Sequence, residues 1–409
     1  MSLYILNRRF SVGLSLLLLF GPGRAMALEG DVLTPYASVT ESYDDNLLRL
    51  NSSAQARALL GDDDLSDTIT SEAVGLIVDK QISLQHLNFK FELNHNDFDH
   101  FSVLDNVGGH ATGTWNWHVG PHLEGNLGGS YVRSLSSFTD FRPIVNGALV
   151  RNMLDQKREF ADIAWKLHPS WSLNASLSNY DVGNSDSSQR VNDRNEVAKQ
   201  IGFDYLPSTG SSVGVRLTRT DGEFTGFTLG PGDLRNKTYE DDEASIVANW
   251  LYSGKTHINF KVGMISKSFE QQPSQNFTEP NGRLTVDWFV TGKTTLTLSL
   301  WRDIYAVDEI ASFVDSKGVS LSPVWAATSK ISVLGRLAYE ERAQAGASNQ
   351  AASVPPINDT ITSALVGVTY SPTLHLKFTL SAEHDERDSS DANVSFTDNT
   401  VMLNGRFEF

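Results

Sequence analysis

The sequence contains no cysteine, little helical periodicity and only one long apolar run. Without disulfides, the stability of a 409-residue chain has to come from a large packed or closed sheet. After residue 27 no segment approaches the roughly 20 apolar residues that a transmembrane helix needs. Lys and Arg number 33 against 49 Asp and Glu, and this net charge of -16 argues against nucleic acid as a partner.

The amino terminus has the pattern of a secretory signal peptide. Arg8 and Arg9 precede an apolar run over residues 10–20, and the small-residue site Ala25-Met26-Ala27 follows. We expect cleavage after Ala27, so that residues 1–27 are the signal peptide and residues 28–409 the exported domain. The exported domain is then soluble, peripheral or a membrane β-barrel.

The remainder of the chain alternates between apolar and polar residues. In residues 87–94, for example, the apolar positions are Leu87, Phe89, Phe91 and Leu93. Side chains alternate between the two faces of a strand, so each such segment has one apolar and one wet face. Segments of about ten to thirteen residues match the length of tilted transmembrane strands.

Short turns and long polar stretches follow one another in strict alternation. The short turns are predicted near Lys80, Gly120-Pro121, His168-Pro169, residues 207–210, Ser253-Gly254, Gly292, Ala326-Ala327 and Pro372. The long stretches include residues 44–66, 136–157, 181–194, 221–238 and 342–358. Eight hairpins, a first strand near residues 34–43 and a closing strand predict about 18 strands. The expected fold is all-β: a single closed antiparallel transmembrane β-barrel with short periplasmic turns and long extracellular loops.

The last nine residues resemble the closing strand of bacterial outer-membrane barrels. Their outward face is predicted to carry Val401, Leu403, Phe407 and Phe409. In such barrels the terminal Phe is read by the barrel assembly machinery, which implies that machinery as a partner. The alternative is the last strand of a soluble β-sandwich.

Seven tryptophans support the barrel, because the strand phase puts all of them on the apolar face and most of them beside a short turn. They are Trp115, Trp117, Trp165, Trp171, Trp250, Trp288 and Trp325. Such a ring matches the aromatic girdle at the interface of lipid and water. Trp301 alone falls on the wet face.

The wet face is the predicted lumen, and its Lys and Arg nearly balance its Asp and Glu. Residues 136–157 are unusually apolar for a loop, and Leu149, Val150, Met153 and Leu154 have helical spacing after Asn146. We expect a short amphipathic helix that folds into the barrel mouth and makes a basic constriction; the alternative is a loop that packs on its extracellular neighbours or on a partner protein. The expected pore-lining or solute-contacting residues are Arg142, Arg151, Arg158, Lys166, Tyr180 and Trp301.

The first segment of the exported domain, residues 35–50, resembles the start of the EpsL-like outer-membrane proteins of exopolysaccharide operons, which often accompany an exosortase system. The specific part is Tyr43-Asp44-Asp45-Asn46-Leu47-Leu48-Arg49. The resemblance implies a passive outer-membrane pore for export of an exopolysaccharide, with the polysaccharide as transported substrate and periplasmic or inner-membrane export partners. It implies no site residue.

Alternative functions are a general or solute-specific diffusion porin and a surface adhesion or structural barrel. An outer-membrane lipid hydrolase is disfavoured, because Gly210-Ser211-Ser212-Val213-Gly214 opens a predicted strand where a catalytic serine needs a strand-to-helix turn. The acidic run Asp62-Asp63-Asp64 lacks the Gly and Glu of a calcium loop. We therefore expect no catalytic residue, no metal site and no cofactor, and the surroundings to be outer-membrane lipid and lipopolysaccharide.

Overall fold

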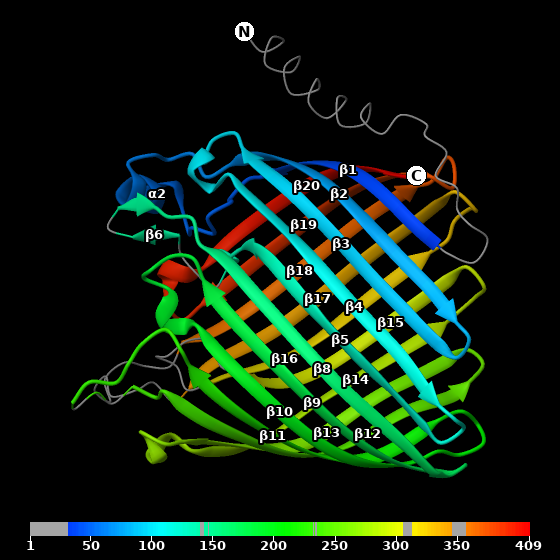
Figure 1. Ribbon diagram of the computed structural model, residues 1–409. Helices are drawn as coiled ribbons and strands as arrows, with labels where there is room; N and C mark the ends of the chain where they lie inside the picture. The colour runs from blue at the N-terminus through cyan, green and yellow to red at the C-terminus, as the bar shows by residue number, and fades with distance from the viewer. Residues whose placement is uncertain are drawn as a thin grey trace.

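Eighteen strands form one closed antiparallel sheet in the computed structural model (Figure 1). The structure describes residues 32–139, 143–145, 147–231, 233, 235–305, 313–345 and 357–409. Consecutive strands pair throughout, and β1 pairs with β20 to close the barrel. The predicted fold class is confirmed. Residues 1–27, the expected signal peptide, lie outside the described residues.

The wall consists of strands of 12 to 16 residues. They are β1 (Val32–Asp44), β2 (Asp67–Ile82), β3 (Gln85–Phe98), β4 (Asn106–Val119), β5 (Leu123–Leu135), β8 (Met153–His168), β9 (Trp171–Asn184), β10 (Arg194–Tyr205), β11 (Ser212–Phe224), β12 (Thr238–Ser253), β13 (Thr256–Phe269), β14 (Phe277–Phe289), β15 (Thr294–Tyr305), β16 (Phe313–Trp325), β17 (Ile331–Ala345), β18 (Asn358–Tyr370), β19 (Leu376–Ser389) and β20 (Phe396–Glu408).

The long loops carry the remaining elements. These are helix α2 (Ser53–Leu60), the strand pair β6 (Ile144–Val145) and β7 (Ala148–Leu149), and the 3-10 turns η1 (Ser102–Leu104), η2 (Arg190–Asn192), η3 (Pro273–Gln275) and η4 (Ala392–Val394). Within the described ranges, no helix has the length and apolar content needed to cross a membrane.

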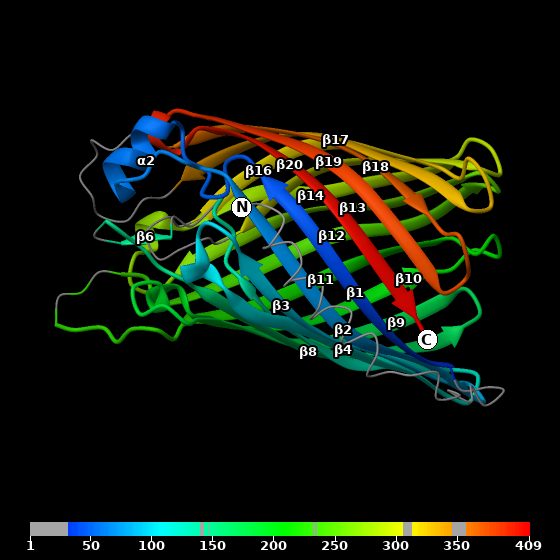
Figure 2. The same cartoon turned by 90° about the horizontal axis from the view of Figure 1, so that it is seen from above.

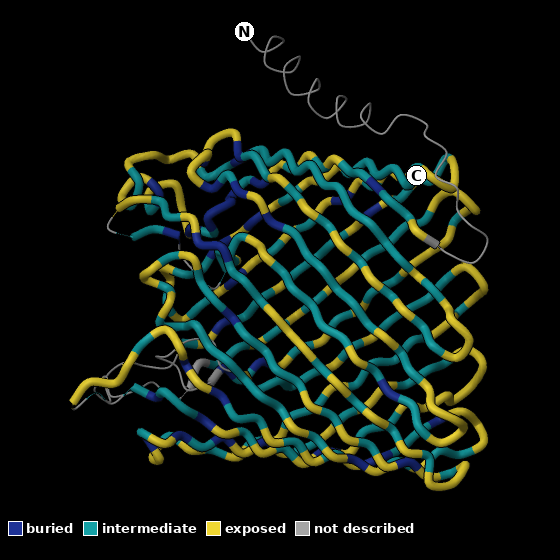
Figure 3. Tube along the Cα trace, viewed as in Figure 1, coloured by how far each residue is buried: buried dark blue, intermediate teal, exposed yellow. Residues whose placement is uncertain are grey.

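The outer face of the wall is apolar, as the period-two pattern predicts. Leu127, Leu217 and Leu337 are 51, 56 and 59 % exposed. Exposed and partly buried positions alternate along the strands, while many of the buried positions gather toward the long-loop end (Figure 3). A face with this many exposed leucines fits lipid and not water.

All eight short turns occur near their predicted places, and seen from above they lie at one end of the barrel, opposite α2 and β6 (Figure 2). The first turn is formed by Ser83 and Leu84, slightly later than the predicted position at Lys80. Ser83 adopts a φ of 55°, which gives the tight reversal that a two-residue hairpin needs.

The tryptophan girdle is present. Six of the seven predicted members have between 40 and 51 % of their surface exposed on the outer face, namely Trp115, Trp165, Trp171, Trp250, Trp288 and Trp325. Trp117 is less exposed because its ring lies over Gly125, its cross-strand neighbour.

The expectation of a helix after Asn146 is wrong. Ile144 pairs with Leu149 and Val145 with Ala148 in the small hairpin β6–β7, and β8 already begins at Met153. The sequence Asn146-Gly147 is a strong signal for a two-residue hairpin turn, and Gly147 has a φ of 78°. The turn chemistry therefore overrides the helical spacing of the apolar side chains.

The seam between the first and last strands is fixed at both ends. At the short-turn end, the backbone N–H of Phe409 donates to the carbonyl oxygen of Pro35 at 2.9 Å. Val401 and Leu403 face the lipid, and the rings of Phe407 and Phe409 meet edge to face at 4.9 Å. The predicted closing strand is thus in place, and its recognition by assembly machinery stays a prediction.

At the long-loop end, the seam is held by an arginine between two buried carboxylates. One nitrogen of Arg49 lies 2.9 Å from Oδ2 of Asp44 on β1 and 2.9 Å from Oδ1 of Asp398 on β20. Asp45 accepts from both the backbone and side-chain amides of Asn399, and Asn46 donates to the carbonyl oxygen of Thr397. Residues 44–49 therefore bind the end of β1 to the start of β20.

Replacing Arg49 by alanine should destabilise the barrel by about 3–5 kcal/mol, because two buried carboxylates lose their cation. The temperature at which the folded form is lost on unboiled gels measures this effect. The matched control is Arg57→Ala, since the Arg57–Asp63 pair has side chains 68 and 53 % exposed and is expected to contribute about 0–1 kcal/mol. Equal shifts for the two variants would contradict the account of the seam.

Candidate functional site

The inner face of the barrel is polar, and most of its charges are paired between neighbouring strands. Lys166 Nζ lies 2.6 Å from Glu124 Oε2, and Arg216 lies 2.6 Å from Oδ1 of Asp204. Such pairs satisfy one another and leave a wall that presents both donors and acceptors to the lumen.

Three of the inward-facing basic side chains form no ion pair within the part of the chain that the structure describes. They are Lys90, Arg158 and Arg336. They stand on β3, β8 and β17, so unpaired positive charge is spread around the wall and not gathered into one constriction.

One arrangement recurs on the inner wall: an aromatic ring lies across a glycine directly opposite it on the next strand. Four such pairs occur on the described strands: Tyr36 with Gly75, Phe160 with Gly128, Tyr239 with Gly222, and Trp301 with Gly318. A Cβ built on each of these glycines would overlap the ring, so only glycine lets the ring lie flat on the wall. We call the three whose rings carry an O–H or N–H group, those of Tyr36, Tyr239 and Trp301, the three aromatic–glycine pairs.

The first pair is closed to the lumen. The Tyr36 hydroxyl donates to Oε2 of Glu92 at 2.5 Å, and the guanidinium carbon of Arg406 lies 3.7 Å above the ring. Only 2 % of Tyr36 is exposed. The cation therefore occupies the face that a solute would need.

The second pair is also closed. The Tyr239 hydroxyl donates to Oε1 of Glu196 at 2.5 Å, and Nζ of Lys267 lies 3.9 Å from the ring centre. Phe224 and Phe269 pack beside the ring in a buried cluster. Tyr239 is 3 % exposed, so its ring, too, is unavailable to the lumen.

The third pair remains partly open. Trp301 is only partly buried, and its Nε1–H donates to Oγ of Ser316 at 3.1 Å, which in turn donates to Oε1 of Glu340 at 2.7 Å. The nearest guanidinium carbon, that of Arg283, is 5.6 Å from the ring centre. Arg283 is bonded to Asp303, and its guanidinium lies over the indole at this longer distance.

The outer mouth contains an apolar core that the loops build against β3. Its buried members are Leu47, Leu48, Leu50, Ala56, Phe98, Phe101 and Leu104. Ile144 and Leu149 of the β6–β7 hairpin pack against it. The β6–β7 hairpin therefore packs on the first extracellular loop, residues 45–66, in agreement with the alternative that the loop packs on its neighbours.

The loop after β5 also reaches the far side of the β1–β20 seam. Arg387 of β19 donates to the carbonyl oxygen of Thr139 at 2.6 Å and pairs with Asp359 at 2.7 Å, and both Arg387 and Asp359 are buried. β19 and β5 are separated by β20 and β1–β4, so the segment after β5 spans part of the mouth. The mouth is thereby narrowed by packed loops.

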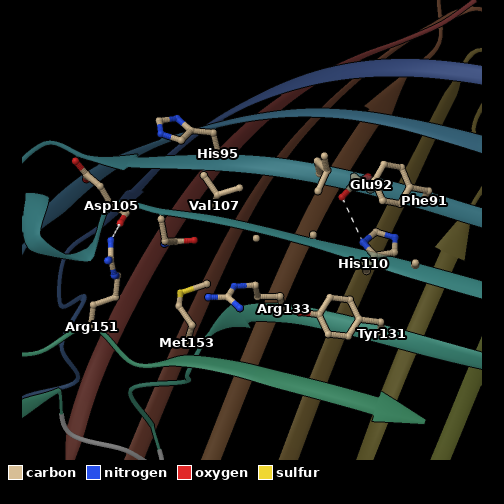
Figure 4. A pocket seen from close by; sticks show the side chains of 15 residues that line it. Phe91, Glu92, His95, Asp105, Val107, His110, Tyr131, Arg133, Arg151 and Met153 are labelled. Atoms are coloured by element: carbon tan, nitrogen blue, oxygen red, sulfur yellow. Dashed lines mark hydrogen bonds and ion pairs between the residues drawn. The ribbon is translucent and has the colours of Figure 1, made fainter. Parts of the chain in front are cut away.

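Of the six residues expected to line the pore, Arg142 lies outside the described residues. Arg151 is at the rim, where it donates to the carbonyl oxygen of Asp105 and lines a groove of about 520 Å³ together with Arg133 and Val107 (Figure 4). Val107 and its alternate neighbours are on the lipid-facing side of β4, so this groove opens toward the outer face of the wall.

Arg158 and Tyr180 are cross-strand neighbours on β8 and β9, and Lys166 lies near the short-turn end beside Glu124. Trp301 is on β15, six strands away from β9. The structure thus brings Arg158 and Tyr180 together and separates them from Trp301. Their contribution to solute passage stays a prediction.

Sequence reasoning missed Tyr36 and Tyr239 as lumen residues and Arg49 as the seam cation. The signal for the first two is an aromatic residue on the wet face opposite a glycine on the adjacent strand, which can be read once the register is known. No local pattern reveals that Arg49 meets Asp398, because the two residues are 349 positions apart in the sequence. Only closure of the barrel brings them together.

The described residues contain one acidic cluster of ligand type, Asp44, Asp45 and Asp398. The guanidinium of Arg49 pairs with Asp44 and Asp398 and supplies the positive charge that a metal ion would otherwise provide. Ser212 begins strand β11 directly after a turn, so the G-x-S-x-G match lacks the strand-to-helix geometry of a catalytic serine.

Comparisons with known proteins agree with this geometry. Residues 248–409 match the family described as "Putative beta-barrel porin 2". Among solved structures the chain is similar to Pseudomonas aeruginosa OpdK with vanillate, Pseudomonas aeruginosa OccK2 (OpdF) in complex with glucuronate, and a BenF-like porin from Pseudomonas fluorescens Pf-5. Each has a TM-score of 0.50 and 10 % identity, and the alignments cover 92–93 % of this chain and 99–100 % of the other. The search of curated proteins gives no match.

These findings define the class: the chain is an outer-membrane β-barrel of the porin fold, and it lies in contact with outer-membrane lipid and lipopolysaccharide. The expected kinship with EpsL-like proteins is wrong, because the family match is to a porin family and a similar structure is a BenF-like porin. The seven residues that carried the resemblance, 43–49, hold the β1–β20 seam.

The mouth also contains a pH-dependent anchor outside the membrane-spanning strands. Nε2 of His100 lies 2.9 Å from Oδ2 of Asp62, and its Nδ1 lies 3.2 Å from the carbonyl oxygen of Ser66. Burial alone would lower the pKa of His100, but the hydrogen bonds to Asp62 and Ser66 outweigh it and raise the pKa above its ordinary value.

A group whose folded-state pKa is raised stabilises the fold below its unfolded pKa, about 6.5 for His, and loses this contribution as pH rises through the folded value. We therefore predict that the first loop loosens on going from about pH 6 to pH 9. The natural chain has no cysteine, so the variant Ala58→Cys can be labelled at this position alone. A nitroxide attached there should gain mobility over this pH range. His100→Gln should remove the pH dependence, and an unchanged curve in that variant would contradict the anchor.

Proposed function

We propose that this chain is a diffusion porin that passes small polar solutes across the outer membrane without a chemical step. The observation that carries the proposal is the inner wall, where charges are paired across neighbouring strands and polar groups line the lumen. An 18-strand barrel encloses an aqueous channel unless it is filled. The packed loops at the mouth favour small solutes over large ones.

The matched porin family and the similar porin fold support this function over polysaccharide export, for which the sequence offered only the EpsL-like resemblance. The titles of two similar structures name vanillate and glucuronate. At 10 % identity no binding residue can be carried over, so these names inform the proposal only on solute size. We propose in addition that residues 1–27 direct export and that Phe409 is read during assembly.

The paired wall predicts a pore with weak charge selectivity. In planar bilayers, the reversal potential in a salt gradient should stay near zero, because most inward charges are paired and the unpaired ones are spread around the wall. Lys261→Gln should shift it toward cation preference by freeing Glu243, which now lies 2.6 Å from Lys261 Nζ. The matched control is Lys199→Gln, whose parent lysine pairs with Asp221 on the outer face of the wall.

A purified, folded barrel that gives no conductance at all would contradict the proposed function. A wild-type pore with strong preference for anions or cations would contradict the claim that the wall charges neutralise one another. It would leave the proposed diffusion function standing.

A further inference from the structure

The three aromatic–glycine pairs differ in one respect, and that difference identifies a solute site. Tyr36 and Tyr239 are 2 and 3 % exposed, with cations 3.7 and 3.9 Å from their rings. Trp301 keeps part of its surface in the lumen, and the nearest cation is 5.6 Å away. The indole therefore keeps part of its surface open to the lumen, and the guanidinium over it lies farther from the ring than the cations over the two tyrosines.

The indole is held rigidly at this position. Gly318 lies directly opposite and accommodates the ring, and the hydrogen bond to Ser316 fixes its orientation. Ser316 is buried and is itself bonded to Glu340. A ring that is already ordered pays little conformational entropy when a solute stacks on it.

The groups beside the indole are charged but balanced. Arg283 is directly opposite Trp301 on β14 and is bonded to Asp303, while Lys261 is opposite Arg283 on β13 and pairs with Glu243 at 2.6 Å. A hollow of about 340 Å³ is lined by Lys261, Arg283 and Asp303 with Asn281, and so lies beside Arg283, the cross-strand neighbour of Trp301. One buried oxygen of Asn281 has no hydrogen-bond partner.

This chemistry selects among solute classes. An anion at the hollow would meet Glu243 and Asp303, and a cation would meet Lys261 and Arg283, so neither gains a net electrostatic advantage. Hydroxyl groups both donate and accept, and can therefore bond to either member of each pair. A ring with an apolar face can at the same time cover the indole.

We propose that Trp301 and the adjoining hollow form a binding site for a neutral sugar of pyranose type on its way through the pore. The site rests on the proposed diffusion function and names its substrate class. It differs from a basic constriction because it uses an aromatic face and paired charges, not an excess of arginines.

Maltose, a neutral disaccharide, is the probe, and its block of single-channel current in planar bilayers is the measurement. Wild type should show concentration-dependent block by maltose and weaker block by glucuronate at the same concentration. Trp301→Ala should weaken maltose block by about tenfold, as expected for the loss of one stacking contact. Trp301→Phe should keep an intermediate affinity, because a ring remains.

The matched control is Trp288→Ala, which removes a tryptophan from the lipid-facing side of the neighbouring strand β14 and should leave maltose block unchanged. A conducting wild-type pore that maltose does not block would overturn the sugar site and leave the diffusion function standing. Equal or stronger block by glucuronate would overturn the neutral class. A barrel without conductance would defeat the proposed function itself.

Discussion

Closure of the sheet is the constraint on which this structure depends. Lipid provides no partner for a backbone N–H or C=O group, so every strand in the wall has to be bonded on both sides. The chain meets this requirement by pairing β1 with β20 from Tyr36–Glu408 to Asp44–Thr400. Without disulfides, the seam relies on these hydrogen bonds and on the buried cluster of Arg49, Asp44 and Asp398.

A closed wall then divides the side chains into two environments. Outward positions meet lipid and are apolar, while inward positions have to satisfy charge and hydrogen bonds in a narrow space. The chain solves the second problem with cross-strand ion pairs and with large rings laid over glycines. In the Tyr36 and Tyr239 pairs these devices strengthen the wall, whereas at Trp301 the same device leaves a surface for function.

Much of the barrel follows from the sequence because its cause is local. Three features can be read from one strand at a time, because each depends on a strand with lipid on one face and water on the other. They are the alternation along residues 87–94, the turn residues near Gly120 and Gly292, and the tryptophans beside the turns. The strand number follows from counting these units. The terminal strand could be recognised because its aromatic end is a property of the chain itself.

The rest depends on contacts between distant segments. Leu149 and Met153 have the spacing of a helix, yet they belong to a hairpin and to β8, since the positive φ of Gly147 and the mouth core decide the conformation. The segment 43–49 suggested a family, but its composition reflects the partners it meets on β20. Trp301 was identified on the wet face, whereas its distinction from Tyr36 and Tyr239 requires the register and the positions of three cations.

The rate at which small uncharged solutes enter liposomes containing the purified barrel tests the central claim most directly. The account predicts rapid swelling with the smallest solutes and a steep decline as solute size rises, because the lumen is aqueous and its mouth is narrowed by packed loops. Swelling no faster than that of protein-free liposomes, with the barrel folded and inserted, would contradict it.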